Sequence, residues 1–343
     1  MNKNRTIWFD LLKILAIFAV VVIHVASFTF LEMPLFSNRW HVSNIYDSMV
    51  RFCVPVLVMI SGALFLDEKK EINIKKLYKK NIFRLLTAYL SWNIIYYFYN
   101  VHFNNLSYSV LKAPFIKELH VWFIPMIIGL YIITPILKVI VKDKKNTEYL
   151  LIIFLIFGII IPTIKDILTI DYITVSSFLS DFKPELSGYV GYYILGHYLY
   201  TYKPYKNESA MFILSYIIGT IMCIIGTIMV SSITASKAIL FYEYFSVTTF
   251  IQAVSVFCFF EYTVSKKQFS NKVNNLISKL ANLTFGIYLV HMLVIYMLQE
   301  IGFGSHVINS IINIPLLSIV SFLISLLIAL IIDKIPIINK YMI

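Results

Sequence analysis

The chain has 343 residues, of which 59% are hydrophobic and only 14% are charged. A soluble globular domain is nearer half apolar and a quarter charged, so this composition excludes an ordinary water-soluble fold. The net charge of +11 would be compatible with nucleic-acid binding in a soluble chain, but a membrane protein also needs basic cytoplasmic loops. We therefore interpret the charge as a topology signal and expect no nucleic-acid partner.

The apolar residues form about ten runs of membrane-spanning length, separated by short polar stretches. We predict an all-α, polytopic transmembrane bundle, built as a single integral membrane domain over residues 1–343. Cys53, Cys223 and Cys258 fall inside apolar runs without metal-ligand spacing, so we interpret them as packing residues and expect no metal. The predicted spans are 7–30, 44–66, 82–102, 121–141, 149–164, 188–202, 210–232, 245–264, 283–301 and 311–332.

The distribution of basic residues predicts the orientation. With the N-terminus inside, 20 of the 29 Lys and Arg residues lie in cytoplasmic segments and six in external loops. The positive-inside rule then places both termini in the cytoplasm of a multi-pass protein, which we expect in a bacterial cell membrane. The spans at 149–164 and 188–202 are weak, and losing one alone would invert everything downstream. The loop at 67–84 carries seven basic residues, which either set orientation or bind phosphates and lipid headgroups.

Ionisable groups at membrane depth are costly, so each one points to a structural or functional role. Asp10, Lys13 and His24 fall within roughly 60° of one another on one helix face, with His24 roughly 16 Å beyond Lys13. A histidine there can remove a proton or accept an acyl group, or it can simply hydrogen-bond a neighbouring helix. Asp47 and Arg51 form an i,i+4 pair, which is either structural or supplies a cation for an anion or oxyanion.

Further candidates lie on later spans, and each taken alone favours a structural role. Their positions predict that His24, Arg51, His120 and Glu300 share a similar outer depth. His197 and Glu261 are predicted nearer the cytoplasm. The outer and mid-depth candidates on these spans are His120, Trp122, His291 and Glu300.

Four segments in order along the chain resemble the acyltransferase 3 family of integral membrane acyltransferases. RTIWFDLLKILAIFAVVVIH at 5–24 resembles the opening of the family, and RFCVPVLVMISG at 51–62 resembles its arginine, proline and Ser-Gly signature. A basic stretch through Arg84 then leads into the next span. HVWFIPMIIGLYIITPIL at 120–137 resembles the His-x-Trp-Phe element, and LTFGIYLVH at 283–291 resembles the late Ile-Tyr-x-x-His segment.

The resemblance implies transfer of an acyl group, commonly acetyl from acetyl-CoA, to a hydroxyl of a cell-envelope polysaccharide or lipid-linked saccharide. It implies a donor substrate rather than a tightly bound cofactor. His24 becomes the leading catalytic residue, with Asp10, Lys13 and Arg51 in the family's acidic and basic positions. Many members have a second arginine where this chain has Lys13, which keeps the charge but loses the bidentate fork. The secondary candidates for the donor or acceptor site are His120, Trp122, His291, Glu300 and Arg84.

A different class of protein, a transporter or flippase of an envelope precursor, also fits a bundle with embedded Asp, Arg and His groups. The absence of an evident internal repeat counts against it. The sequence leaves open the acceptor, the choice between acetyl and a longer group such as succinyl, and the oligomeric state. It also leaves open whether the histidine carries the acyl group covalently or acts as a general base.

Overall fold

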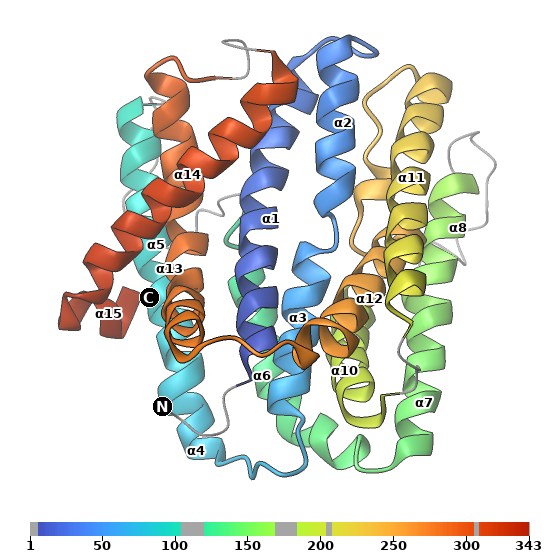
Figure 1. Cartoon of the computed structure of the whole chain (residues 1–343), viewed down its shortest axis with the longest axis vertical. Coiled ribbons are helices and arrows are strands. Elements are labelled where there is room, and N and C mark those ends of the chain that lie inside the picture. Colours follow the sequence, from blue (N-terminus) through green and yellow to red (C-terminus); the bar gives the residue numbers. More distant parts are fainter. Residues whose placement is uncertain (1–5, 104–119, 169–183, 204–207, 305–308, 343) are drawn as a thin grey trace.

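The computed structural model describes residues 6–103, 120–168, 184–203, 208–304 and 309–342. Every regular element in these residues is a helix, which confirms the predicted all-α class. The long helices stand side by side as a bundle, with α1 (Ile7–Glu32) near its centre (Figure 1). Helix α1 packs against α13 (Asn271–Glu300) and α14 (Ser310–Asp333), and also against α2 (Asn38–Val50) and α3 (Cys53–Phe65). It is this central helix that carries His24.

The other helices follow in chain order, and several predicted spans consist of consecutive helical segments. They are α2 (Asn38–Val50), α3 (Cys53–Phe65), α4 (Ile74–Lys76), the π-helix η1 (Leu77–Ile82), α5 (Phe83–Phe103), α6 (Phe123–Ile140), α7 (Lys144–Ile153), the π-helix η3 (Phe154–Ile160), α8 (Ile161–Leu168), α10 (Pro184–Tyr202), α11 (Ser209–Thr234), the 3₁₀ turn η5 (Leu240–Tyr242), α12 (Val247–Tyr262), the 3₁₀ turn η6 (Val264–Lys266) and α15 (Pro336–Met342).

Within the described residues, each of the ten predicted spans coincides with a helix or with a run of consecutive helices. Eight of these are long and apolar enough to cross a membrane. The predicted fifth span, which was short as 149–164, is lengthened by the flanking helical residues to Lys144–Lys165. The remaining two, α5 and α10, are less apolar. Most of α10 is buried against protein, so its Tyr and Gly residues do not need to face lipid.

The second predicted span is broken into two helices at Arg51 and Phe52. The cause is Pro55, which lacks an N–H and therefore cannot bond the carbonyl four residues earlier, at Arg51. Helix α3 begins instead at Cys53, where its first turn is closed by a bond from the Val56 N–H to the Phe52 carbonyl (3.0 Å). The break places Arg51 inside the bundle rather than in the middle of a regular helix.

Helices α3 and α10 approach each other closely enough for their backbones to touch. A Cβ added at Gly62 would lie 1.8 Å from the Tyr193 carbonyl oxygen, and one added at Gly196 would lie 2.0 Å from the Met59 carbonyl oxygen. Small residues at facing positions are what allow such approach between membrane helices. The position of α3 in the bundle is thus set by main-chain contact on its α10 side.

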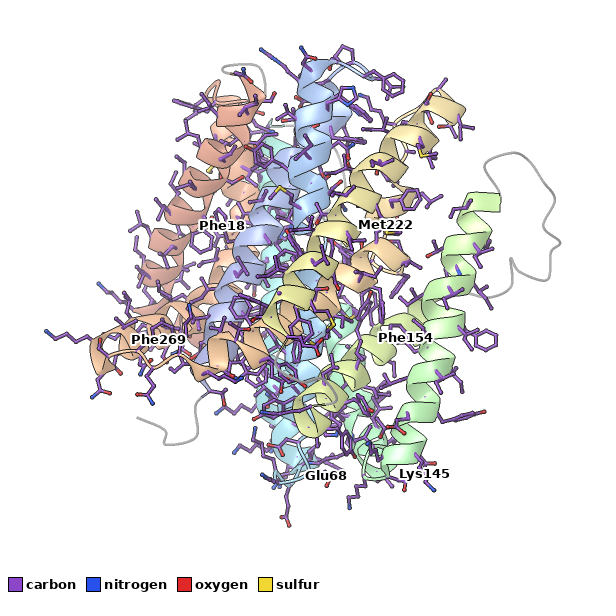
Figure 2. The ribbon with its side chains drawn as sticks, turned by 45° about the vertical axis from the view of Figure 1, so that its right-hand side comes forward. Phe18, Glu68, Lys145, Phe154, Met222 and Phe269 are labelled. Carbon is purple, nitrogen blue, oxygen red and sulfur yellow. The ribbon has the colours of Figure 1, made fainter. Side chains whose placement is uncertain are left out.

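Two polar segments with basic residues meet at one end of the bundle. Figure 2 shows Glu68 and Lys145 at the same end of the molecule, although they are far apart in the sequence and Lys145 lies in the first turn of α7. Both segments are predicted to be cytoplasmic.

Candidate active site

Three histidines from three helical regions meet beside the centre of α1. The ring centroid of His24 lies 5.2 Å from that of His291 and 6.3 Å from that of His120. His120 and His291 are 5.1 Å apart and are 2% and 0% exposed, whereas His24 is only half-buried. Within the part of the chain that the structure describes, no hydrogen bond ties down the His24 ring, and no His, Cys, Asp and Glu side chains are arranged as a metal site.

His120 is held in place through its backbone. It precedes α6, whose first turn accommodates Pro125 because the first N–H groups of a helix have no internal partner. The hydroxyl of Tyr288, on α13, donates a hydrogen bond to the His120 carbonyl. The Tyr96 ring of α5 packs edge-on against His120 with centroids 5.0 Å apart. Elements α5 and α13 therefore fix a histidine that no regular helix carries.

Tyr96 also shapes α13 next to His291. Its hydroxyl donates to the Leu289 carbonyl (2.8 Å) and accepts from the Leu293 N–H (3.2 Å), two groups that ordinarily pair with each other in an α-helix. This side chain thus couples α5 to the turn of α13 that carries His291.

The hydrogen bond of His291 assigns its tautomer. Nδ1 lies 2.6 Å from the Tyr288 carbonyl oxygen, and a carbonyl can only accept, so Nδ1 carries the proton. Nε2 is then a lone-pair acceptor, and this buried atom has no hydrogen-bond partner among the described residues. His291 consequently offers an acceptor within the histidine cluster.

His24 lines a small cavity, which we call the His24 cavity. It has about 30 Å³ of room and is more enclosed than the larger cavity described below. His120 and Trp122 also line it, and aliphatic side chains such as Val20 and Val54 complete much of its wall. A polar pair, His24 and His120, therefore faces a space that is otherwise mainly apolar.

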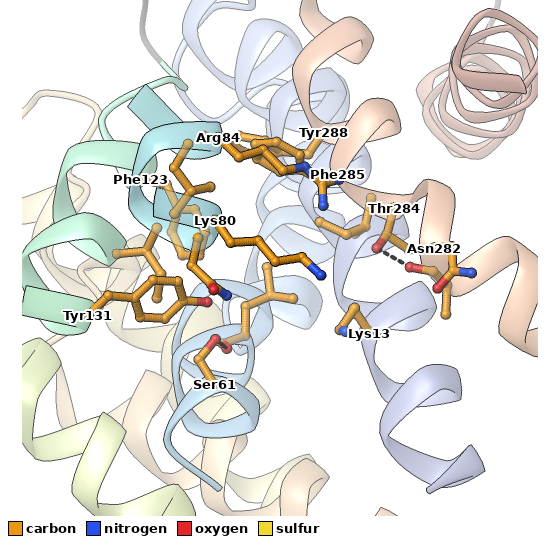
Figure 3. A pocket seen from close by; sticks show the side chains of 16 residues that line it. Lys13, Ser61, Lys80, Arg84, Phe123, Tyr131, Asn282, Thr284, Phe285 and Tyr288 are labelled. Atoms are coloured by element: carbon orange, nitrogen blue, oxygen red, sulfur yellow. Dashed lines mark hydrogen bonds between the residues drawn. The ribbon is translucent and has the colours of Figure 1, made fainter. Parts of the chain in front are cut away.

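A second and larger cavity, which we call the cationic cavity, has about 360 Å³ of room (Figure 3). Lys13, Lys80 and Arg84 line it, while no carboxylate does so among the lining residues that are described. In Figure 3, the Lys80 side chain extends across the cavity toward Lys13. Lys80 belongs to the π-helix η1 and Arg84 to the first turn of α5, so this irregular helical segment supplies two of the cations. The site is suited to a multiply charged anion.

The two cavities share a wall. Leu57, Phe123 and Tyr288 contribute to the lining of both. They come from α3, α6 and α13, and the rings of Phe123 and Tyr288 meet edge to face with centroids 5.7 Å apart. These three side chains therefore lie between the two cavities.

The ion pair of Asp47 and Arg51 lies outside both cavities. Arg51 bridges to Asp47, donates to the Tyr242 carbonyl (3.4 Å) and stacks over the Tyr242 ring with its Cζ 4.0 Å from the centroid. Asp47 also accepts from the Ser27 hydroxyl (3.1 Å), and Ser27 lies one turn beyond His24 on α1. The pair therefore joins α2 to α1 and to the η5 turn.

The remaining predicted residues divide between the cavities and positions outside them. Lys13 and Arg84 line the cationic cavity, and Trp122 lines the His24 cavity. Asp10 is buried and accepts from the Ser278 hydroxyl (3.1 Å), which links α1 to α13. Glu300 is exposed at the end of α13, roughly 13 Å along the helix from His291, and lines neither cavity.

Sequence reasoning missed the wall residues and Lys80. Leu57, Phe123 and Tyr288 all lie inside the motifs at 51–62, 120–137 and 283–291. The sequence does not distinguish one largely apolar residue of a span from the others, so it does not reveal their role. In the sequence, Lys80 is one of seven basic residues at 67–84, and nothing there separates it from the other six. In the structure it lies in η1, directly before α5.

These features are those of an enzyme embedded in a membrane: a half-buried histidine faces a small space beside a cavity lined by cations. A family model described as an acyltransferase domain matches residues 6–332. The match spans nearly the whole chain, so the protein belongs to the acyltransferase 3 family and is a multi-pass membrane acyltransferase, as the motif resemblance implied. A search of curated proteins and a search of solved structures found no significant match.

Proposed function

We propose that the protein transfers an acyl group from acyl-CoA to a hydroxyl of a cell-envelope polysaccharide or lipid-linked saccharide. The observation that carries this proposal is the pair of adjoining cavities, one cationic and one containing His24, with a shared wall. A coenzyme A molecule combines phosphates with a long, weakly polar arm that ends in the thioester, and the two cavities match those two ends.

In this proposal Lys13, Lys80 and Arg84 bind the phosphates on the cytoplasmic side. The pantetheine arm then passes Leu57, Phe123 and Tyr288, so that the thioester carbonyl lies beside His24. A point charge is sufficient for binding a phosphate, so Lys13 can serve where relatives have arginine.

The chemistry requires a proton acceptor and a donor for the developing oxyanion. His24 takes the proton of the acceptor hydroxyl as its oxygen attacks the thioester carbon, and the imidazolium returns that proton to the departing thiolate. His120 lines the same cavity and donates an N–H to the oxyanion. We assign the unpartnered Nε2 of His291 as the acceptor that receives the other N–H of His24 once substrate is bound and so orients the His24 ring. A covalent acyl-histidine intermediate is the second candidate route, and the experiments below distinguish it from direct transfer.

The test uses membranes from cells that make the protein, because these membranes contain the native acceptor. Radiolabelled acetyl-CoA is added, and label is counted in the glycan and lipid fractions. We expect His24→Ala to reduce incorporation by at least about 100-fold while the protein remains folded, the scale of losing a general base. His291→Ala lowers kcat with little change in the KM for acetyl-CoA.

The matched control is His41→Ala, because His41 lies on α2 among Phe36 and Trp40 and lines neither cavity. Full incorporation by His24→Ala would refute the proposal. Absence of incorporation by the wild type, together with movement of a labelled envelope precursor across vesicles, would favour transport. The covalent route is tested with purified protein and acetyl-CoA in the absence of acceptor. Release of thiol in an amount equal to the amount of enzyme would establish it.

A further inference from the structure

We infer that the wall between the two cavities limits the transferred group to acetyl, and that Leu57 sets this limit. The inference rests on the proposed function, because it takes the cationic cavity as the donor site and the His24 cavity as the place of reaction. It concerns the length of the acyl group, which neither the motifs nor the family match determine.

The first argument is size. The His24 cavity has about 30 Å³ of room. On the same measure one water molecule needs about 10–15 Å³, so the cavity holds about two to three water-sized groups. The carbonyl oxygen and methyl group of an acetyl thioester take two of these places, and the attacking hydroxyl takes the third. A propionyl or butyryl group adds methylenes for which the enclosed space has no place.

The second argument is polarity. Val20, Ile23 and Val54 form the aliphatic part of the lining, and no Lys or Arg is present among the described residues around the cavity. A succinyl group would place its carboxylate against these side chains without a counter-ion. Burying an unpaired carboxylate is strongly unfavourable, so succinyl is excluded by charge as well as by length.

The third argument identifies Leu57 as the adjustable part of the wall. Tyr288 is fixed by its hydrogen bond to the His120 carbonyl, and Phe123 begins α6 and packs on the Tyr288 ring. Leu57 is 9% exposed and purely aliphatic, so shortening it enlarges the space next to His24 without leaving a polar group unpaired.

The experiment compares four labelled donors, acetyl-, propionyl-, butyryl- and succinyl-CoA, in membranes that contain the protein. Incorporation in His24→Ala membranes is subtracted as background. One methylene in a tight pocket changes kcat/KM by about 10-fold or more, so we expect at least about a 10-fold preference for acetyl over propionyl in the wild type. Butyryl and succinyl fall lower still.

Two variants enlarge the His24 cavity, and one does not. Leu57→Ala is expected to reduce the acetyl-to-propionyl ratio by about 10-fold, reversing the discrimination against one methylene. Val54 lines only the His24 cavity, so Val54→Ala is expected to lower the ratio too and carries the test if Leu57→Ala fails to accumulate. Ile127 lines only the cationic cavity, so Ile127→Ala leaves the ratio unchanged, even where it lowers the absolute rates.

The outcomes separate this inference from the proposed function. Absence of His24-dependent incorporation from all four donors overturns both. If the wild type incorporates acetyl and butyryl groups at rates within about threefold of each other, the length limit alone is overturned. A tight pocket is expected to discriminate far more strongly. An equal change of ratio in Leu57→Ala and Ile127→Ala, or none in the enlarging variants, also overturns it.

Discussion

The ion pair of Asp47 and Arg51 lies inside the bundle but outside both cavities, and its role is to hold the helix that carries His24. The side chains are 1% and 11% exposed; Ser27 donates a hydrogen bond to Asp47, and Arg51 donates one to the Tyr242 carbonyl. Because Ser27 is one turn from His24, the pair holds the central helix in place. We assign Arg51 this positioning role, since it lines neither cavity.

The assignment predicts a compensating pair of substitutions. Asp47→Leu alone and Arg51→Met alone each leave a buried charge without its partner, which costs about 3–5 kcal/mol in folded proteins. Their combination removes both charges, so we expect Asp47→Leu/Arg51→Met to regain most of the lost thermal stability in detergent. Fluorescence-detected size exclusion after heating measures this recovery.

The same double variant separates a structural role from a catalytic one. We expect it to retain measurable acetyl incorporation, because the histidine cluster is intact. A folded double variant with activity as low as that of His24→Ala would contradict the positioning role and assign Arg51 to the oxyanion.

At the scale of single residues, the sequence predicted what one helix can determine. The common face of Lys13 and His24 follows from helical periodicity, and Lys13 does reach one cavity while His24 reaches the other. The meeting of His24 with His120 and His291 depends on how three separate helical regions pack, which a periodicity does not encode. Glu300 was predicted at the depth of His24, but it lies on the exposed end of α13.

Among the helices, the contact between α3 and α10 leads to a sharp prediction. Gly62→Ala places a methyl group 1.8 Å from the Tyr193 carbonyl oxygen, so the two helices must separate. Overpacking of this kind typically costs about 1–3 kcal/mol, and we expect a lower midpoint of thermal unfolding and less monodisperse protein.

Gly129 on α6 provides the matched control. Nothing lies within 4 Å of a Cβ added there, so Gly129→Ala is expected to be neutral or to stabilise α6 by up to about 1 kcal/mol through helix propensity. Equal midpoints for the two alanine variants would show that the close approach of α3 and α10 does not contribute to stability.

The elements themselves were largely predictable, and the exceptions have physical causes. Long apolar runs fixed the positions of the spans, because a bilayer requires them. The break after Val50 was missed, although Pro55 is its visible cause. The predicted fifth span was shorter than the helix because the helix begins with polar residues at Lys144, which an apolar run does not include. The Asp143 side chain caps this polar start by accepting a hydrogen bond from the Asn146 N–H (2.8 Å).

For the whole molecule, charge counting predicts both termini in the cytoplasm. All three cysteines are buried and unpaired, so the wild type gives little background with a membrane-impermeant maleimide. Asn38 and Glu68 are exposed at opposite ends of the α2–α3 pair. We expect Asn38→Cys to be labelled in intact cells and Glu68→Cys only after the membrane is permeabilised.

The control for this experiment is the wild-type chain, which should stay unlabelled under both conditions. The reverse pattern, with Glu68→Cys labelled in intact cells, would place the cationic cavity on the outside. In that case coenzyme A could not reach Lys13 and Lys80 from the cytoplasm, and the proposed donor route would be refuted.

The backbone contact between α3 and α10 also constrains how fast the route to His24 can open. Main chains that touch at Gly62 and Gly196 cannot be compressed further, so α3 has little freedom to slide toward α10. On the α3 side, we therefore expect the space beside Leu57 to change through rotation of side chains about their own bonds. Such rotations belong to the picosecond to nanosecond range when exposed and are slower in a packed core, whereas collective helix movements take microseconds to milliseconds. We therefore expect donor loading to depend on rotamer exchange at Leu57 rather than on a slide of α3 toward α10.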